Sequence, residues 1–343
     1  MKEIKYLTNS DSDLEIAALL LKDGQLVGMP TETVYGLAAD ATNAEAVERI
    51  FEAKGRPSDN PMIIHISDID MLKEYTEDIP NVVYKLAEKF WPGPLTMVLP
   101  KRGNVPSIVT AGLDTVAVRM PANECARKII ELVGKPLAAP SANVSGYPSP
   151  TTAQHVIDDM NGKISAVVDD GVCNVGLEST VISFEGYDSI RILRPGYITP
   201  EQLKTVVDDV VIDKNAISDE AVVTGEVRSP GMKYKHYSPK AKVVLVREGL
   251  EMFKKYVAEY ANDADTCCLI FDYDAADFPY KYMTYGNTPE EQAQQIFAKL
   301  READKKGIKK LFVRAPRKEG VGLAVYNRLI RASGYEVVEC EQS

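Results

Sequence analysis

The sequence has few of the side chains that bind transition metals. It contains three histidines, and its five cysteines form no C-x-x-C pair and no spacing typical of a zinc site. We therefore assign no metal ligand, and we interpret the cysteines as reduced, small apolar residues.

Long apolar runs are also absent. No stretch approaches the roughly 20 apolar residues that a membrane helix needs. Residues 1–13 (MKEIKYLTNSDSD) lack the apolar centre and the cleavage site of a signal peptide. We expect a cytoplasmic protein that does not contact a membrane. The net charge of −10 argues against bulk attraction to nucleic acid, so any polyanion must bind at a local basic patch.

Several catalytic motifs are missing as well. The chain has no Walker A pattern and no G-x-S-x-G elbow, so neither a P-loop nor a serine hydrolase is indicated. Gly320-Val321-Gly322 resembles the start of a dinucleotide fingerprint, but Val325 occupies the third glycine position. We interpret these glycines as a site of close helix packing.

The 343 residues instead show the pattern of two α/β units. Residues 1–205 contain more predicted strands than helices, with irregular crossovers, which predicts a mixed twisted open sheet with helices. Residues 206–241 pass from an acidic stretch to a basic one broken by Pro230-Gly231 and Pro239, which predicts a linker. Residues 242–343 alternate strands and helices, which predicts a small Rossmann-like, three-layer unit with a parallel sheet.

Local signals predict the positions of several elements. Ser12 or Asp13 should cap the first helix, and Asn43 should cap the second. Residues 136–143 and 267–274 are predicted as strands because both are rich in apolar residues.

Residues 28–66 carry more polar side chains than a protein core needs. Lys54 and Arg56 follow a predicted helix, and His65 lies in the apolar strand MIIHI. A compact lysine charge beside a planar arginine suits the binding of a polyphosphate. The structural alternatives are that the two cations serve a helix C-terminus and that His65 is an ordinary core residue.

Two later groups extend this candidate anion site. Arg119 alternates with apolar residues in VAVRMP, where an arginine without an anionic partner is costly, and it is a candidate for binding a carboxylate substrate. Ser141-Ala142-Asn143 follows an apolar strand, and open α/β sheets bind ligands at the carboxyl ends of their strands. A plain turn is the alternative for this second group.

Several motifs follow one another along the chain. They are PTETVYGLAAD (30–40), KGRP with Asn60-Pro61 (54–61), WPGPLT (91–96), Ser141-x-Asn143, GLESTV (176–181), RPG (194–196) and SPGMKYKHYSP (229–239). In this order they resemble the YrdC-like synthases that make threonylcarbamoyl-AMP, in the long form with an extra C-terminal domain.

The resemblance implies a YrdC-like fold and a nucleotidyltransferase activity. Such an enzyme forms L-threonylcarbamoyladenylate and pyrophosphate from L-threonine, bicarbonate or CO2, and ATP, for threonylcarbamoyladenosine modification of tRNA. A downstream threonylcarbamoyl-transfer complex acts on the tRNA, and Mg2+ is expected with ATP. Whether the protein binds tRNA directly is left open.

The resemblance also implies roles for individual residues. Lys54 and Arg56 are expected to be catalytic. Threonine is expected to contact Thr33, His65, Arg119 and Ser179. ATP is expected to contact Lys54, Arg56, Asn60, Thr115, Ser141, Asn143, Ser149, Arg194, Tyr234 and His236.

The linker has two interpretations. It is either a solvated basic connector or a lid over the first unit, in which Tyr234, His236 and Tyr237 reach the nucleotide and water is excluded from a labile anhydride.

Two other functions stay as alternatives at this point. A carbamoyltransferase of the hydrogenase-maturation type shares the first domain, but it also carries an acylphosphatase-like module and cysteine-rich zinc motifs that this chain lacks. A double-stranded RNA-binding module needs a basic concave face, which the charge of −10 disfavours.

Overall fold

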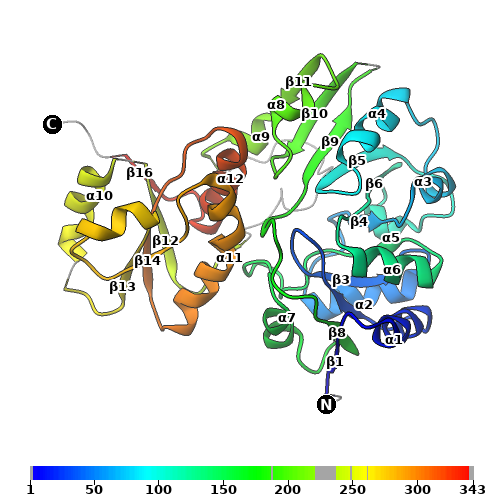
Figure 1. The fold of residues 1–343 in the computed structure, drawn as a ribbon, viewed down its shortest axis with the longest axis horizontal. Coiled ribbons are helices and arrows are strands. Elements are labelled where there is room, and N and C mark those ends of the chain that lie inside the picture. The colour runs from blue at the N-terminus through cyan, green and yellow to red at the C-terminus, as the bar shows by residue number, and fades with distance from the viewer. Residues whose placement is uncertain (1–2, 187, 221–236, 248, 261, 340–343) are drawn as a thin grey trace.

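The structure, a computed structural model, describes residues 3–186, 188–220, 237–247, 249–260 and 262–339. Their strands form two separate sheets, one of eleven strands and one of five (Figure 1). The larger sheet has the order β1 (Lys5–Leu7), β8 (Ala166–Val168), β2 (Val27–Met29), β3 (Gly36–Asp40), β7 (Leu137–Ala138), β4 (Ile63–His65), β6 (Thr115–Arg119), β5 (Leu95–Pro100), β9 (Thr180–Phe184), β10 (Ser189–Arg194) and β11 (Asp209–Ile212). The smaller sheet has the order β14 (Tyr282–Thr284), β13 (Thr266–Ile270), β15 (Lys310–Arg314), β12 (Lys242–Val246) and β16 (Val337–Val338).

Helices accompany both sheets. Those of the larger one are α1 (Asp11–Lys22), α2 (Ala44–Lys54), α3 (Ile69–Tyr75), α4 (Asn81–Phe90), α5 (Ser107–Thr110), α6 (Glu124–Val133), α7 (Ala153–Met160), α8 (Pro200–Leu203) and α9 (Lys214–Ile217). Those of the smaller one are α10 (Leu250–Val257), the 3-10 helices η1 (Ala258–Tyr260) and η2 (Asp272–Asp277), α11 (Pro289–Lys305) and α12 (Gly320–Ala332).

The larger sheet is mixed, which confirms the fold class predicted for this part of the chain. β4 runs parallel to β6, whereas β7 runs antiparallel to both of its neighbours, β3 and β4. The strands in the middle of this sheet therefore run in both directions.

Alternation along the central strands separates the two faces of this sheet. Ile64 points into the main apolar core, together with the buried stripes of α1, α2, α4 and α6. Ile63 and Ala117 point to the opposite face, where they belong to a small separate apolar cluster. His65 and Arg119 continue on this second face because each lies two residues further along its strand.

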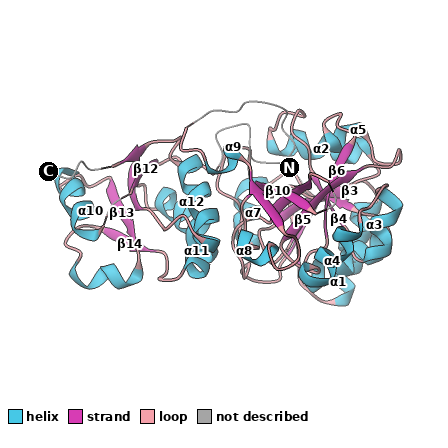
Figure 2. Cartoon of the chain, turned by 90° about the horizontal axis from the view of Figure 1, so that it is seen from above, coloured by secondary structure: helices cyan, strands magenta, loops and turns pink. Residues whose placement is uncertain are grey.

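The smaller sheet is the middle of three layers (Figure 2), as the alternating pattern predicts. All of its strand pairs are parallel. Helix α10 packs on one face through Phe253 and Val257, and α11 and α12 cover the other face through residues such as Phe297 and Leu329. Helices α11 and α12 lie on the side that faces the larger sheet (Figure 1).

Two predicted helix starts have different outcomes. Asn43 caps α2 by accepting a hydrogen bond from the backbone N–H of Ala46, as predicted. The prediction for the first helix was wrong, because Ser10 is the cap and accepts from the backbone N–H of Asp13. Serine, threonine and aspartate all serve as caps, so the cluster Thr8–Asp13 offers the sequence several equivalent choices.

Two predicted strands are shorter than expected. Residues 136–143 contribute only Leu137–Ala138, because Pro140 has no N–H with which to continue the ladder. Strand β13 ends at Ile270, where the predicted strand 267–274 passes into η2 and the carboxylate of Asp274 accepts from the backbone N–H of Phe271.

The part of the chain after residue 205 still adds to the larger sheet. Strand β11 pairs in parallel with β10, and α9 contacts both β10 and α12. The division expected at residues 205 and 242 stays a prediction.

Two other expectations, on the cysteines and on membrane helices, are compared here with the described residues. Cys125, Cys173, Cys267 and Cys268 are buried free thiols, as interpreted from the sequence. None of the described helices combines the length and apolar character required to span a bilayer.

Candidate active site

A pocket on the second face of the larger sheet, hereafter the sheet pocket, collects most of the expected site residues. Its walls come from the β2–β3 loop, the ends of β4, β6 and β10, the segment after β7, and the residue before β9. It brings together Thr33, Arg56, His65, Arg119, Ser141, Asn143, Ser179 and Arg194.

The sheet pocket spans the width of the sheet face. His65 and Arg119 are register partners in the parallel pair β4–β6, so their side chains lie next to each other. Ser141 forms an isolated bridge with Gly36, at the start of β3. Because β7 is antiparallel to β4, Ser141 lies toward the opposite end of β4 from His65. A ligand that contacts both groups must therefore extend across the face, which differs from the expected site at one edge.

Arg119 is buried and holds one end of the sheet pocket. Its Nη1 donates to Thr33 Oγ1 at 2.8 Å, and its Nε donates to the Gly93 carbonyl at 3.3 Å. Its Nη2 lies 2.6 Å from Glu32 Oε1 as an ion pair, but that approach does not have hydrogen-bond geometry. Neither carboxylate oxygen of Glu32 has a hydrogen-bond partner. The guanidinium thus keeps a donor for an incoming acceptor.

His65 is neutral in this environment. Burial first, and then the positive charge of Arg119, lowers its pKa from 6.5 to about 3. Its Nδ1 is buried and has no hydrogen-bond partner. The histidine therefore offers a ligand a neutral ring nitrogen beside a fixed cation.

Lys54 is the last residue of α2 and is 3% exposed. Its Nζ donates to the carbonyls of Ser141 and Asn143, the second at 2.6 Å. Burial first, and then the charge of Arg56, lowers its pKa well below the usual value for lysine. The ammonium thus ties the α2 end to the segment after β7. Lys54 does not line the pocket itself, and its charge lies behind the wall formed by Ser141 and Asn143.

Arg56 and Asn60 lie on the loop after α2. Arg56 Nη2 donates to the carbonyls of Asn60 and Pro61 at 2.8 and 3.1 Å, which folds the loop back on itself. Burial lowers the pKa of Arg56 to about 10. Arg56 Nε and Asn60 Oδ1 are buried without hydrogen-bond partners.

Asn143 and Arg194 form the remaining polar walls. Asn143 Nδ2 donates to the carbonyls of Val144 and Tyr147, while its Oδ1 is buried without a partner. Arg194 donates through Nε to the Ser179 carbonyl and through Nη2 to Ser179 Oγ, both at 3.1 Å. Ser179 Oγ also lies 2.7 Å from Thr96 Oγ1. Burial lowers the pKa of Arg194 to about 10.

Ser149 lies behind the pocket wall. Its hydroxyl donates to Glu178 Oε1 at 2.6 Å, and Glu178 Oε2 accepts from Arg328 Nε of α12 at 2.8 Å. Burial alone would raise the pKa of Glu178, but Arg328 and Arg194 hold it below the usual value. An arginine of the smaller unit thus balances an acid of the pocket.

Three expected site residues are placed differently. Thr115 lies on the same sheet face as Arg119 but four positions earlier on β6, where it lines another hollow with Asp78 and Val98. Its expected contact with ATP receives no support from the pocket geometry. Tyr234 and His236 lie outside the described residues, so their roles and the lid interpretation stay predictions. Tyr237 is described, is buried and lines the sheet pocket.

Residues 19–196 match the Sua5/YciO/YrdC family model, which carries the description telomere recombination. Residues 198–334 match a second model, threonylcarbamoyl-AMP synthase, C-terminal domain. The chain belongs to the Sua5/YciO/YrdC family.

Full-length relatives of this family are named threonylcarbamoyl-AMP synthase. The chain is 44% identical to the one from Pyrococcus abyssi, covering 95% of both chains. It is 41% identical to the one from Bacillus subtilis, covering 97% of this chain and 96% of that protein. A crystal structure of P. abyssi Sua5 complexed with L-threonine matches with a TM-score of 0.91 at 41% identity, covering 99% of this chain and 100% of that chain. These findings confirm the resemblance found in the motifs.

Sequence reasoning missed three charged residues of this family member. Glu32 and Glu178 lie inside the quoted motifs PTETVYG and GLESTV, and an acid among so many cations was the available signal. Arg328 had none, because it follows Glu178 by 150 residues.

Proposed function

We propose that the protein is a threonylcarbamoyl-AMP synthase that joins L-threonine, bicarbonate or CO2, and ATP in the sheet pocket, and releases pyrophosphate. One observation supports this pocket above all. Of the nine buried side-chain nitrogen and oxygen atoms without a hydrogen-bond partner among the described residues, seven lie in or beside it, on Glu32, Arg56, Asn60, His65, Arg119 and Asn143. Buried polar groups are normally paired, so this concentration indicates that a polar ligand completes the site.

The reaction needs charge stabilisation rather than a covalent nucleophile. The amine of threonine captures CO2 as a carbamate, and a carbamate oxygen attacks the α-phosphorus of ATP. The bond from that phosphorus to the bridging oxygen of pyrophosphate breaks, and pyrophosphate leaves with the electron pair. Negative charge builds on phosphoryl oxygens, so fixed cations are the main catalytic device.

In this proposal the end of the pocket around Arg119 binds threonine. The guanidinium donates charge-assisted hydrogen bonds to the carboxylate of the amino acid, and its contact with Thr33 fixes its orientation. Neutral His65 and the hydroxyl of Ser179 offer polar contacts to the rest of the substrate. The carboxyl of Glu32 has free lone pairs beside Arg119 and suits the ammonium of threonine before the carbamate forms.

The opposite end of the pocket binds ATP. Lys54 and Arg56 stabilise the phosphoryl charge of the transition state, and Asn60, Ser141, Asn143 and Arg194 hold the nucleotide. Ser149 acts indirectly, because its hydroxyl and Arg328 both donate hydrogen bonds to the carboxylate of Glu178. Thr115 contacts ATP only if the nucleotide extends along β6, and this role stays a prediction.

Mg2+ is expected to arrive with the triphosphate. In the described part of the chain, no three histidine, cysteine, aspartate or glutamate side chains come together as a metal site. We assign no ligand and no step to the ion.

The wider setting of the enzyme is also part of the proposal. A downstream complex would transfer the threonylcarbamoyl group to tRNA, and the cytoplasmic location rests on the sequence. The carbamoyltransferase and RNA-binding alternatives are less well supported, since the full-length relatives share the synthase name.

Pyrophosphate release from ATP tests the proposal. We expect release to require both L-threonine and bicarbonate, and to produce a threonylcarbamoyl-adenylate mass. Equal release without threonine would contradict the proposal. A salt-dependent shift of double-stranded RNA with no pyrophosphate release would instead support the RNA-binding alternative.

A further inference from the structure

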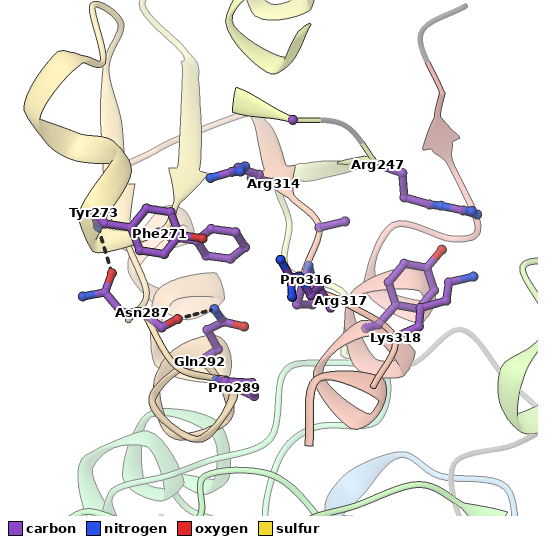
Figure 3. A pocket seen from close by; sticks show the side chains of 13 residues that line it. Arg247, Phe271, Tyr273, Asn287, Pro289, Gln292, Arg314, Pro316, Arg317 and Lys318 are labelled. Carbon is purple, nitrogen blue, oxygen red and sulfur yellow. Dashed lines mark hydrogen bonds between the residues drawn. The ribbon is translucent and has the colours of Figure 1, made fainter. Parts of the chain in front are cut away.

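A second cavity, of about 600 Å³, lies in the smaller unit (Figure 3). We call it the C-terminal pocket. It opens beyond the carboxyl ends of β12, β13 and β15, and it shares no lining residue with the sheet pocket. The proposed reaction makes no use of it.

The topology of the small sheet places this cavity at a switch point. β12 and β15 are adjacent and parallel, but α10, which follows β12, packs on one face of the sheet. Helix α12, which follows β15, packs on the other face. The chain thus departs from two neighbouring strands in opposite directions, which leaves a crevice outside their carboxyl ends. Open α/β sheets bind their ligands in such crevices.

One wall of the C-terminal pocket is aromatic. Phe271 and Tyr273 lie side by side with ring centroids 5.4 Å apart, and the guanidinium of Arg314 sits 4.7 Å from the Phe271 ring. Tyr273 is 60% exposed at the rim, which is unusual for so large an aromatic side chain. An exposed aromatic face over a cavity suits the stacking of a flat ring.

The opposite wall is cationic (Figure 3). Arg247 and Lys318 share the carboxylate of Asp219. Arg314, on the aromatic side of the pocket, pairs with Asp274. Arg317 is exposed, and no described carboxylate forms an ion pair with it. Among the described residues, the guanidinium of Arg317 is therefore without a carboxylate partner and lies next to cations that are already held in place.

A buried acceptor between these walls lacks a donor. Gln292 is 4% exposed, and its Nε2 donates weakly to the Asn287 carbonyl at 3.5 Å. Its Oε1 is buried without any hydrogen-bond partner, and the side chain lines the cavity. An unpaired buried oxygen is costly unless a ligand supplies a donor.

We propose that the C-terminal pocket binds a nucleotide. Its base stacks on Tyr273, an amino or hydroxyl group of the base or ribose donates to Gln292 Oε1, and its phosphate meets Arg317 and Lys318. The cationic wall leads directly into the first turn of α12, whose N-terminal backbone N–H groups also favour an anion. The close packing predicted from the sequence holds at Gly322, where a Cβ would lie 2.4 Å from the Arg317 carbonyl, but not at Gly320, where nothing lies within 4 Å. Gly322 thereby lets the loop carrying Arg317 lie close to α12.

Photolabelling of the full-length protein with 8-azido-AMP tests this site. We expect a label on the peptide that contains Tyr273, and we expect unlabelled AMP to compete for it. The Arg317→Glu variant should weaken this competition at least about tenfold, since it replaces a charged donor with a repelling carboxylate. Gln292→Met, which keeps the shape but removes the acceptor, should weaken it by a smaller factor.

The matched control is Lys204→Glu, which changes the net charge equally on an exposed residue outside both pockets. It should leave the label unchanged. Label confined to peptides of the sheet pocket, or equal competition with Arg317→Glu, would overturn the proposal. Inorganic phosphate that competes as well as AMP would also overturn it, because the stacking wall would then contribute nothing.

The label is read separately from catalysis. Arg317→Glu and Gln292→Met should retain threonine-dependent pyrophosphate release, which also shows that both variants fold. A labelled Tyr273 peptide without threonine-dependent release would count against the proposed function alone.

Discussion

The two pockets hold their cations in different ways. At the sheet pocket Arg119 lines the cavity and Lys54 lies behind its wall, and both are 3% exposed. The Lys54 ammonium rests on backbone carbonyls. In the C-terminal pocket the side chains of Arg247 and Lys318 are 35% and 34% exposed, and each pairs with Asp219. Desolvating a cation costs several kcal/mol, whereas a half-exposed pair costs little and contributes little.

The sheet pocket therefore has cations in fixed positions, whereas the C-terminal pocket has cations that can adapt to a ligand. The buried charges at the sheet pocket weaken the stability of the folded chain. This is reasonable where the binding of an anionic substrate and transition state offsets the loss. The C-terminal pocket holds Arg247 and Lys318 in partly exposed pairs, although its Arg314–Asp274 pair is more buried. Of its cations, only Arg317 has no carboxylate partner among the described residues. Substitutions should therefore have large effects at the first pocket and small effects at the second.

The largest effect is expected when a buried charge loses its ion-pair partner, and this change tests the comparison of the two pockets most directly. Arg328→Met removes the ion-pair partner of the buried Glu178 and leaves that carboxylate with the hydrogen bond from Ser149, and we expect a loss of about 3–5 kcal/mol in the free energy of unfolding. Lys318→Met at the C-terminal pocket should cost less than about 1 kcal/mol. Urea unfolding monitored by circular dichroism measures both. Adding Glu178→Gln to Arg328→Met should recover part of the loss, and equal losses for the two single variants would contradict the comparison.

We expect the rate of catalysis to depend on the cations at the sheet pocket and not on cations elsewhere. Lys54→Met removes a fixed cation from directly behind the wall of the sheet pocket, and we expect kcat for pyrophosphate release to fall by about 10²–10³-fold. Lys101→Met is the control, since Lys101 also donates to a neutral oxygen, Thr110 Oγ1, away from the pocket. Its kcat should be unchanged. A comparable fall in both variants would point to a general loss of folding.

A pair of glycines tests the contact between the two units. Gly176 and Gly171 both have positive φ, at +78° and +80°, so alanine strains the backbone similarly at each. A Cβ at Gly176 would lie 2.3 Å from Gln294 Cα of α11, whereas nothing lies within 4 Å at Gly171. We expect Gly176→Ala to cost about 1–3 kcal/mol more than Gly171→Ala in thermal or urea unfolding. Equal costs would mean that α11 moves away freely.

The effect that vanishes at neutral pH is a pH dependence from His65. Burial holds its folded pKa at about 3, so below pH 6.5 the unfolded state binds a proton that the folded state does not. Stability should therefore fall by about 1.4 kcal/mol per pH unit as the pH drops from 6.5 toward 3. His65→Gln should flatten this slope in urea unfolding between pH 7 and 4.5. His155, whose pKa is lowered to about 4, contributes equally to both proteins. Parallel slopes would contradict the prediction.

The motifs identified most of the residues of the sheet pocket, but they did not predict how these residues are arranged. Arg119 and His65 were recognisable because a charged or titratable side chain in an apolar strand is anomalous by itself. Their adjacency depends on the parallel pairing of β4 and β6, which residues far apart in the chain decide. Thr115 was assigned to the nucleotide by the family resemblance, whereas the structure places it in a different hollow from Arg119.

Local sequence determined what depends on neighbouring residues. The helix Glu124–Val133, its glycine C-cap and the Asn43 cap follow from hydrogen bonds within a few residues. Only the tertiary structure decided that Glu178 meets Arg328 and that α10 and α12 leave adjacent strands toward opposite faces. Such contacts join residues that no local pattern links, because their energy arises only when packing removes them together from water. The sequence by itself thus specified the elements and the chemical groups, and the packing of the two units decided which groups share a pocket.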